Sequence, residues 1–328
     1  MFAIKNSGKN GKFNKKSNGV FFPDKILNLP LLQRFLNWYK NFFSISEIEN
    51  SKILQWFFAY VIFIFFVTFL DWVDARSLTK EAVAGINYLC WSYFQSCGNL
   101  YFLSTLPYGY SYTTLYTFFL GLLILAAYLM FKKKWVIAHI ILTLLFIWKF
   151  LMLFVLSRSF IGNYYYYSII LMLVLLFLPF KLFFLRLIFV ILYFLASTVK
   201  IHEGWILGTN FSSLVTGLPL FHELSIPFFT NLVIILEMMG SWFLLSSNKY
   251  LQRLVFIYFI IFHFYSAILV QYLYPTVLLP ALLILFGPKI RNFKVPLNLK
   301  ALPGFIFIAI LISLQLISCY SRRRKDNT

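Results

Sequence analysis

The stretch LFFLRLIFVILYFLASTVKIHEGWILGT, residues 182–209, carries the features that indicate both the fold class and a candidate site. It opens with an apolar run over 182–199, long enough for a helix that crosses the roughly 30 Å hydrocarbon layer of a bilayer. It then places Lys200, His202 and Glu203 within four residues. Either these titratable groups mark where a helix meets water, or they form a reaction site.

Similar apolar runs recur along the whole chain. Of its 328 residues, 61% are hydrophobic and 12% are charged, whereas a soluble domain averages about 45–50% apolar and about 25% charged residues. We therefore expect an all-α polytopic protein of the cell membrane, with the lipid bilayer as a partner and about nine transmembrane helices in a single bundle. The predicted spans cover residues 52–70, 112–131, 135–156, 165–180, 182–199, 228–246, 254–270, 273–287 and 303–320.

The segments around these spans differ in character. Residues 1–20 are basic and polar and predict a disordered arm, whereas residues 21–51 carry apolar side chains at helical spacing with basic residues between them, which is typical of an amphipathic interfacial helix. Residues 52–320 form the predicted membrane domain, and residues 321–328 form a basic tail. Residues 77–104 are apolar but rich in amides and hydroxyls, so we place them at the outer interface or as a re-entrant segment.

The basic residues orient the chain and account for its net charge of +19. With a cytoplasmic N-terminus, the inner segments hold 20 of the 29 Lys and Arg residues and the outer segments hold eight, as the positive-inside rule requires. The basic run 322–325 opposes this trend: either the last span is miscounted, or the earlier helices override it. Because the charge follows membrane loops, we expect no nucleic-acid partner.

Three ionisable residues fall within predicted spans, where a charge costs about 2.5–3.5 kcal/mol or more and needs a partner or a function. Lys149 either snorkels to the outer interface or faces the bundle interior, where it holds an anionic ligand or pairs with Glu237. Glu237, near the middle of its span, is either a hydrogen-bonded or ion-paired structural group or a proton-handling group. His263 is either a packed core residue or a ligand.

Lys200 differs because it ends a span on the outer side, against the trend of the other basic residues. It is either an interfacial anchor or a general base, because desolvation at the mouth of an apolar bundle favours a neutral amine. The dipeptides His202-Glu203 and His222-Glu223 lack the spacing of a metalloprotease motif, and we expect no metal.

The segment YFLASTVKIHEGWILGT, residues 193–209, resembles the [YF]-F-x-A-x-x-K-[IL]-x-x-x-W-x-x-G segment of the HTTM family, the membrane domain shared with vitamin K-dependent gamma-carboxylases, with three residues in place of two between Ala196 and Lys200. Residues 148–179 resemble the family's span, Asn-rich aromatic turn and following span. Residues 235–269 resemble its glutamate-bearing span, basic turn and histidine-bearing span. The resemblance covers roughly residues 50 to 290.

This resemblance implies a site and a cofactor. In the carboxylases the lysine of the segment deprotonates reduced vitamin K at the outer or lumenal face, so the resemblance implies that Lys200 is the base and that a reduced quinone is the cofactor. We expect Glu237 and His263 to act with Lys200 as catalytic residues and, together with Lys149, to line a cavity open to the outer face. The residues expected to bind substrate are Lys149, Asn163, Tyr164 and Trp205.

Two departures from the carboxylases leave a second function open. Asn163 is followed by Tyr164 where the carboxylases carry a histidine beside the asparagine, and the sequence ends at Thr328, so we expect no large extramembrane domain that binds a propeptide. Smaller members of the family include toxin-maturation proteins. The alternative to a quinol-dependent enzyme is therefore a non-catalytic accessory protein for the maturation or export of a secreted peptide or toxin.

Overall fold

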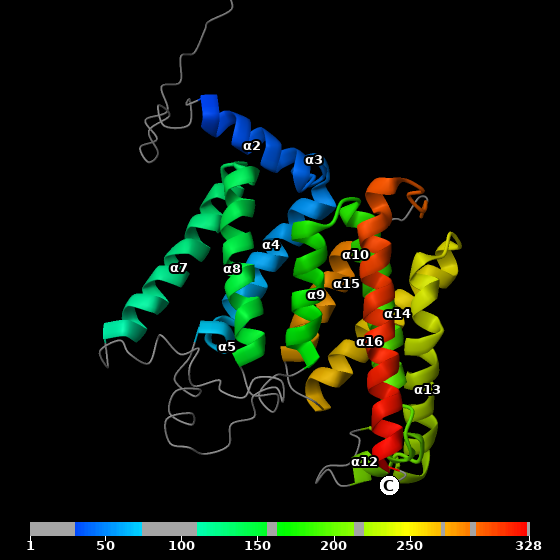
Figure 1. The fold of residues 1–328 in the computed structure, drawn as a ribbon. Coiled ribbons are helices and arrows are strands. Elements are labelled where there is room, and N and C mark those ends of the chain that lie inside the picture. The colour runs from blue at the N-terminus through cyan, green and yellow to red at the C-terminus, as the bar shows by residue number, and fades with distance from the viewer. Residues whose placement is uncertain are drawn as a thin grey trace, which may run out of the picture. The chain divides into compact units, whose positions relative to one another are not determined.

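The computed structural model describes residues 30–73, 110–155, 163–212, 220–269, 273–288 and 293–326. These residues are mostly helical and contain no β-strand (Figure 1). The chain divides into two compact units, residues 1–39 and residues 40–328. The second unit contains nearly all of the described helices and every ionisable residue singled out above.

Each of the nine ranges predicted as spans coincides with a helix. They are α4 (Lys52–Val67), α7 (Tyr110–Phe131), α8 (Trp135–Val155), α9 (Asn163–Phe177), α10 (Lys181–Val199), α13 (Ile226–Met238) with the following 3-10 helix η4 (Gly240–Leu245), α14 (Lys249–Leu269), α15 (Leu273–Phe286) and α16 (Leu302–Asp326). Within the described residues, two helices are long and apolar enough to cross a membrane, at Lys181–Val199 and Lys249–Ile268, and six further apolar helices are shorter. The helical fold is confirmed there, while the number of nine spans stays a prediction.

The predicted interfacial segment is described only from residue 30 onward. Helix α2 (Pro30–Phe42) is followed by the short helix α3 (Ile45–Asn50). The exposed large apolar side chains of α2 recur at helical spacing and are Leu31, Phe35, Trp38 and Phe42. The amphipathic pattern expected for this segment is therefore present in α2.

Other predicted segments fall partly or wholly outside the described residues. The arm at 1–20 and the segment at 77–104 lie outside them. At the other end of the chain, α16 continues to Asp326, so the helix extends into the predicted basic tail, while the end of the membrane domain at residue 320 stays a prediction. Serine, arginine and lysine continue the helix because none of them interrupts the backbone ladder as proline or glycine would.

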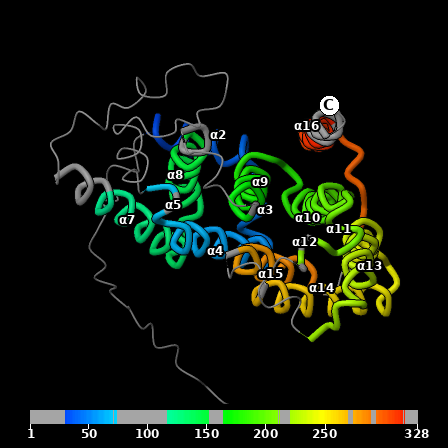
Figure 2. The backbone as a smooth tube through the Cα atoms, turned by 90° about the horizontal axis from the view of Figure 1, so that it is seen from below, coloured from blue at the N-terminus to red at the C-terminus, as the bar shows by residue number. Residues whose placement is uncertain are grey.

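Helix α10 lies at the centre of the second unit and contacts α9, α13, α15, α16 and η4 (Figure 2). Most of its side chains are buried. Helix α16 approaches it closely at Gly304, where an added Cβ would lie 2.2 Å from Cζ of Phe184. The absence of a side chain at Gly304 is what allows the two helices to meet there.

The beginning of α10 is held by a carboxylate from α3. Phe180 precedes the helix in the left-handed conformation (φ 52°) and offers no side-chain cap. Instead, the two carboxylate oxygens of Glu47 accept hydrogen bonds from the backbone N–H groups of Phe180 and Lys181, both at 2.8 Å. A negative charge at this position also complements the positive end of the helix dipole.

We expect Glu47→Ala to lower the free energy of unfolding by about 2 kcal/mol, because it leaves two backbone donors at the start of α10 without their charged acceptor. The measurement is chemical unfolding of the detergent-solubilised protein. The matched control is Glu49→Ala, which removes the half-buried ion pair with Lys40 at 2.5 Å and should cost about 1 kcal/mol or less. Equal losses in the two variants would contradict the capping role.

Candidate functional site

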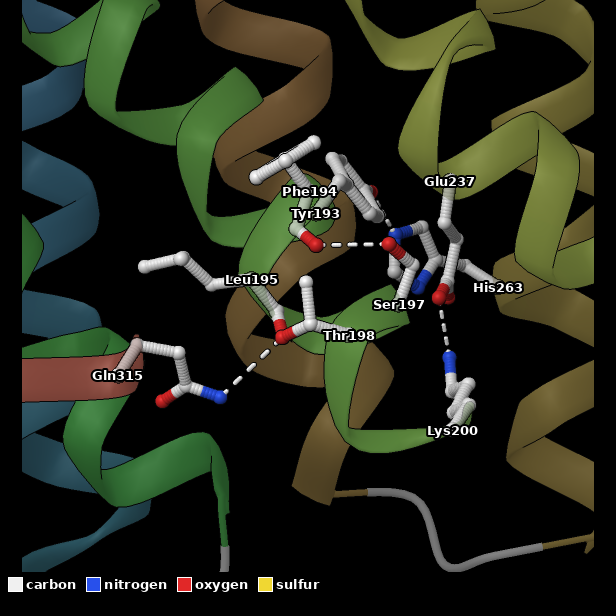
Figure 3. Close-up of polar contacts among 9 residues, drawn as sticks. All are labelled: Tyr193, Phe194, Leu195, Ser197, Thr198, Lys200, Glu237, His263 and Gln315. Atoms are coloured by element: carbon white, nitrogen blue, oxygen red, sulfur yellow. Dashed lines mark hydrogen bonds and ion pairs between the residues drawn. The ribbon is translucent and has the colours of Figure 1, made fainter. Parts of the chain in front are cut away.

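The end of α10 places Lys200 opposite Glu237. Lys200 is the residue at which α10 ends, and its ammonium donates a hydrogen bond to Oε2 of Glu237 in an ion pair (Figure 3). The side chain of Lys200 is 16% exposed and that of Glu237 is 0% exposed. The glutamate charge is therefore sealed from solvent, while the lysine reaches toward the surface.

Lys149 lies in a different environment. Its side chain is fully buried and donates to Oγ1 of Thr68 at 2.9 Å, with the rings of Phe65 and Tyr165 at 5.4 and 4.8 Å from its nitrogen. The snorkelling interpretation is wrong, because aromatic rings from two neighbouring helices enclose the amine. Pairing of Lys149 with Glu237 is also wrong, because the carboxylate is paired with Lys200.

Glu237 lies near the middle of the predicted span 228–246, but the helix changes its form there. It is in the last turn of α13, which ends at Met238 and tightens into the 3-10 helix η4 from Gly240 onward. Glycine is a poor α-helix former, which explains the change at this point. Transitions of this kind inside apolar helices often mark functional sites.

His263 is held by a tyrosine that the sequence analysis did not single out. The hydroxyl of Tyr193 forms a hydrogen bond with Nε2 of His263, and both side chains are buried. Tyr193 also stacks on Phe259 with ring centres 4.2 Å apart. Tyr193 could have been found in the sequence from its position seven residues before Lys200, because this spacing puts both side chains on one face of α10. Figure 3 shows the His263 ring beside Glu237, and the catalytic role expected of His263 stays a prediction.

Further tyrosines surround the ion pair. Those within electrostatic range of Glu237 are Tyr167, Tyr193, Tyr258 and Tyr274. A crevice beside them leaves no room for a water molecule and is lined by Tyr167, Phe189, Leu192, Tyr193, Tyr274 and Leu278. With 21 tyrosines in the chain, residue type alone could not distinguish these four.

Four buried side-chain atoms in the described part of the chain have no hydrogen-bond partner. They are Oε1 of Glu237, Oγ of Ser241, the hydroxyl of Tyr258 and Nδ1 of His263. They come from α13, η4 and α14, and η4 packs against both of these helices. Buried polar atoms are nearly always hydrogen-bonded in proteins, so unpartnered ones in neighbouring elements require an explanation.

The ring of Trp205 lies beside the amine of Lys200. Its ring centre is 5.2 Å from Nζ of Lys200, and that of Phe262 is 5.7 Å away. Trp205 lies in the short helix α11 (Glu203–Ile206), which is followed by Gly208 with φ 73°. A Cβ at Gly208 would lie 2.6 Å from Cγ2 of Ile226, so this turn needs glycine both for its backbone conformation and for its packing on α13.

The remaining predicted residues are less informative. Asn163 begins α9, and its side chain lies outside the described part of the structure, while Tyr164 is half-buried. Among the described residues, Tyr164 is not a partner of the Lys200–Glu237 pair. No three His, Cys, Asp or Glu side chains of the described ranges gather as a metal site. The binding roles of Asn163 and Tyr164 stay predictions.

The unequal burial of the ion pair predicts unequal effects of removing its two members. Lys200→Met leaves a fully buried carboxylate without its counter-charge and should lower the free energy of unfolding by about 3 kcal/mol or more. Glu237→Gln should cost less, because the lysine can turn toward water. Chemical unfolding in detergent measures both, and the double variant should be more stable than Lys200→Met alone. A double variant that loses the sum of the two single effects would contradict the pairing.

Comparison with known proteins leaves the chain without an assigned relative. No family model, no curated protein and no solved structure matches it. The function is therefore inferred from the geometry around Lys200 and Glu237, together with the resemblance of residues 193–209 to the HTTM segment.

Proposed function

We propose that the chain is a multi-pass membrane protein of the HTTM type in which the Lys200–Glu237 pair moves a proton to or from a lipid-soluble substrate. One observation carries the proposal: a fully buried carboxylate is paired with a lysine at the end of α10, within the segment that resembles the family's base-bearing motif. An ionisable pair among apolar helices is costly and is typical of a functional site.

Exposed apolar side chains support the membrane location. On α14 they recur every three or four residues along one side, at Leu254, Ile257, Ile261, Phe264 and Ile268. On α16 the same spacing is found at Ile306, Ile310, Leu314 and Ile317. Apolar stripes of this length are rare on soluble monomers and suit contact with lipid.

The topology can be tested with single cysteines on a background in which Cys90, Cys97 and Cys319 are replaced by serine. Glu203→Cys, next to the proposed site, should react with a membrane-impermeant maleimide in intact cells. Lys134→Cys, in the turn between α7 and α8, should react only after the cells are permeabilised, because the positive-inside rule places it in the cytoplasm. Labelling with the opposite pattern, or at both positions in intact cells, would refute the proposed orientation.

The site fits a ring-bearing, hydroxylated compound such as a reduced quinone. The rings of Trp205 and Phe262 lie beside the ammonium, and the unpartnered atoms of Glu237, Ser241 and Tyr258 can exchange hydrogen bonds with a hydroxyl. A reduced quinone would supply an ionisable hydroxyl. Lys200 and Glu237 would orient it and take up its proton, and the positive charge that the pair gains would be balanced by the negative charge left on the substrate oxygen.

We expect Lys200→Ala to lower the contribution of the protein to its host's phenotype by more than any accompanying loss of protein from the membrane explains. The reason is that alanine can neither neutralise Glu237 nor take part in proton transfer. The measurement is complementation of a deletion strain, with the membrane content of each variant determined by immunoblot. Lys134→Ala, an exposed lysine in a loop, is the matched control. Full complementation by Lys200→Ala would refute the proposed reaction.

A second function, accessory protein in the maturation of a secreted peptide, is favoured by the tight packing beside the pair. The crevice between Tyr193 and Tyr274 does not admit a water molecule, so a substrate enters there only if helices separate. A structural ion pair needs no such opening. A stoichiometric peptide or protein partner that co-purifies with both the unchanged chain and Lys200→Ala would support this function over the enzyme.

A further inference from the structure

We propose that residues 293–300, which connect α15 to α16, bind the inner leaflet of the membrane and prefer anionic phospholipids there. The apolar side chains of this loop enter the leaflet, and Lys294 and Lys300 bind the phosphate groups of the lipids. The inference goes beyond the Lys200–Glu237 pair, and it rests on the proposed function only for the membrane location and the orientation of the chain.

The 293–300 loop exposes three large apolar side chains within five residues. Val295 is 53% exposed, Leu297 is 94% exposed and Leu299 is 85% exposed. The backbone between the two leucines is extended, with Asn298 at φ −136° and ψ 145°, so side chains two residues apart point the same way. Single exposed leucines are ordinary on protein surfaces, whereas apolar side chains gathered on one side of a loop are typical of an interaction site.

Both ends of the loop are held in place. At its beginning, the ring of Phe293 stacks on Phe183 of α10, with ring centres 4.8 Å apart. At its end, the backbone N–H of Lys300 donates to Oδ1 of Asn298 at 3.2 Å, and the next residue, Ala301, is fully buried. The exposed leucines therefore lie between two fixed points, and their exposure is a property of the fold.

The loop lies at the end of the second unit where α10 begins (Figure 1). Phe183 is in the first turn of α10, and Gly304 of α16 approaches the adjacent Phe184. Lys200 is at the opposite end of α10. Because the proposed orientation puts Lys200 at the outer face, it puts the 293–300 loop at the cytoplasmic face.

The exposed apolar surface continues from the loop into α16. Leu302, the first residue of α16, is half-exposed and follows Leu299 by three residues. The stripe at Ile306, Ile310 and Leu314 comes next, at helical spacing. In the proposed membrane location this stripe faces lipid. A bilayer covers the stripe and the leucines of the loop together, so lipid is the partner that fits the loop.

The backbone of the loop limits how deeply it lies. Among the described residues, the backbone groups of Val295, Pro296 and Leu297 have no hydrogen-bond partner. Peptide groups without partners are excluded from the hydrocarbon layer, whereas water and lipid headgroups satisfy them at the interface. The backbone therefore lies at the level of the headgroups, and only the apolar side chains reach the acyl chains.

The charges of the loop select the lipid. Lys294 and Lys300 are both exposed, and neither takes part in the two ion pairs of the described residues. Residues 293–302 contain no aspartate or glutamate. At the level of the headgroups, a lysine is attracted by lipids with a net negative charge. The loop should therefore prefer anionic lipids to zwitterionic ones.

The test reads the surroundings of single cysteines that carry the polarity-sensitive fluorophore NBD. The full chain, with Cys90, Cys97 and Cys319 replaced by serine, is reconstituted into vesicles of phosphatidylcholine and phosphatidylglycerol that contain nitroxide-labelled lipid. NBD at Leu297→Cys should emit at shorter wavelength and be quenched about threefold more strongly than NBD at Ser247→Cys. Ser247 is an exposed polar residue in the turn before α14, on the same side of the membrane. Equal quenching at these two positions would overturn the inference.

A third labelled position separates this inference from the membrane location on which it rests. Ile261 belongs to the exposed apolar stripe of α14, so NBD at Ile261→Cys should be strongly quenched. Quenching at Ile261 without quenching at Leu297 overturns the lipid-binding loop and leaves the proposed membrane location standing. Absence of quenching at both positions refutes the membrane location as well.

The preference for anionic lipid is measured by moving the nitroxide label from phosphatidylcholine to phosphatidylglycerol at constant lipid composition. The ratio of the two quenching efficiencies at Leu297→Cys should favour phosphatidylglycerol and should fall about threefold in Lys294→Gln/Lys300→Gln. The matched control, Lys132→Gln/Lys134→Gln, alters two exposed lysines in the turn between α7 and α8 and should leave the ratio unchanged. Equal ratios in the two double variants would overturn the role of Lys294 and Lys300.

Discussion

The structure around the site depends on a single constraint, the complete burial of the Glu237 carboxylate. A charge that water cannot reach is tolerated only beside an opposite charge and hydrogen-bond donors. Lys200 supplies both, and in doing so it joins the end of α10 to the junction of α13 and η4. The end of α10 and the last turn of α13 are thereby held against each other.

A glutamate holds each end of α10. At its beginning, the carboxylate of Glu47 binds two backbone N–H groups, and at its end the carboxylate of Glu237 binds the side chain of Lys200. Between these points the helix is almost entirely buried among its neighbours. Since both ends are fixed, α10 cannot turn about its own axis. Its face that carries Tyr193 and Lys200 therefore stays oriented so that the hydroxyl of Tyr193 contacts His263.

The sequence predicted the helices well and their lateral arrangement poorly. Apolar runs show roughly where the helices lie, so each of the nine predicted ranges overlaps helical structure, although several ends differ, as at Lys249 and Asp326. They do not fix which residue on one helix faces which residue on another. Lys149 was therefore considered as a partner of Glu237, although it is Lys200 that reaches the carboxylate and Lys149 binds Thr68. The position of a residue along its helix can be read from the apolar pattern. Which side chains pair across two helices depends on how each helix is turned about its axis, and the pattern does not show this.

The same limit explains why residue type alone could not show what surrounds the lysine. Taken alone, a lysine at the mouth of an apolar bundle is a candidate base, because burial favours the neutral amine. The structure adds a carboxylate and two aromatic rings beside it, which are contacts that stabilise a protonated amine, and its role as a base stays a prediction. The lysine remains indispensable in either case, because without it the buried carboxylate would have no counter-charge and an oxyanion formed beside it would have no partner.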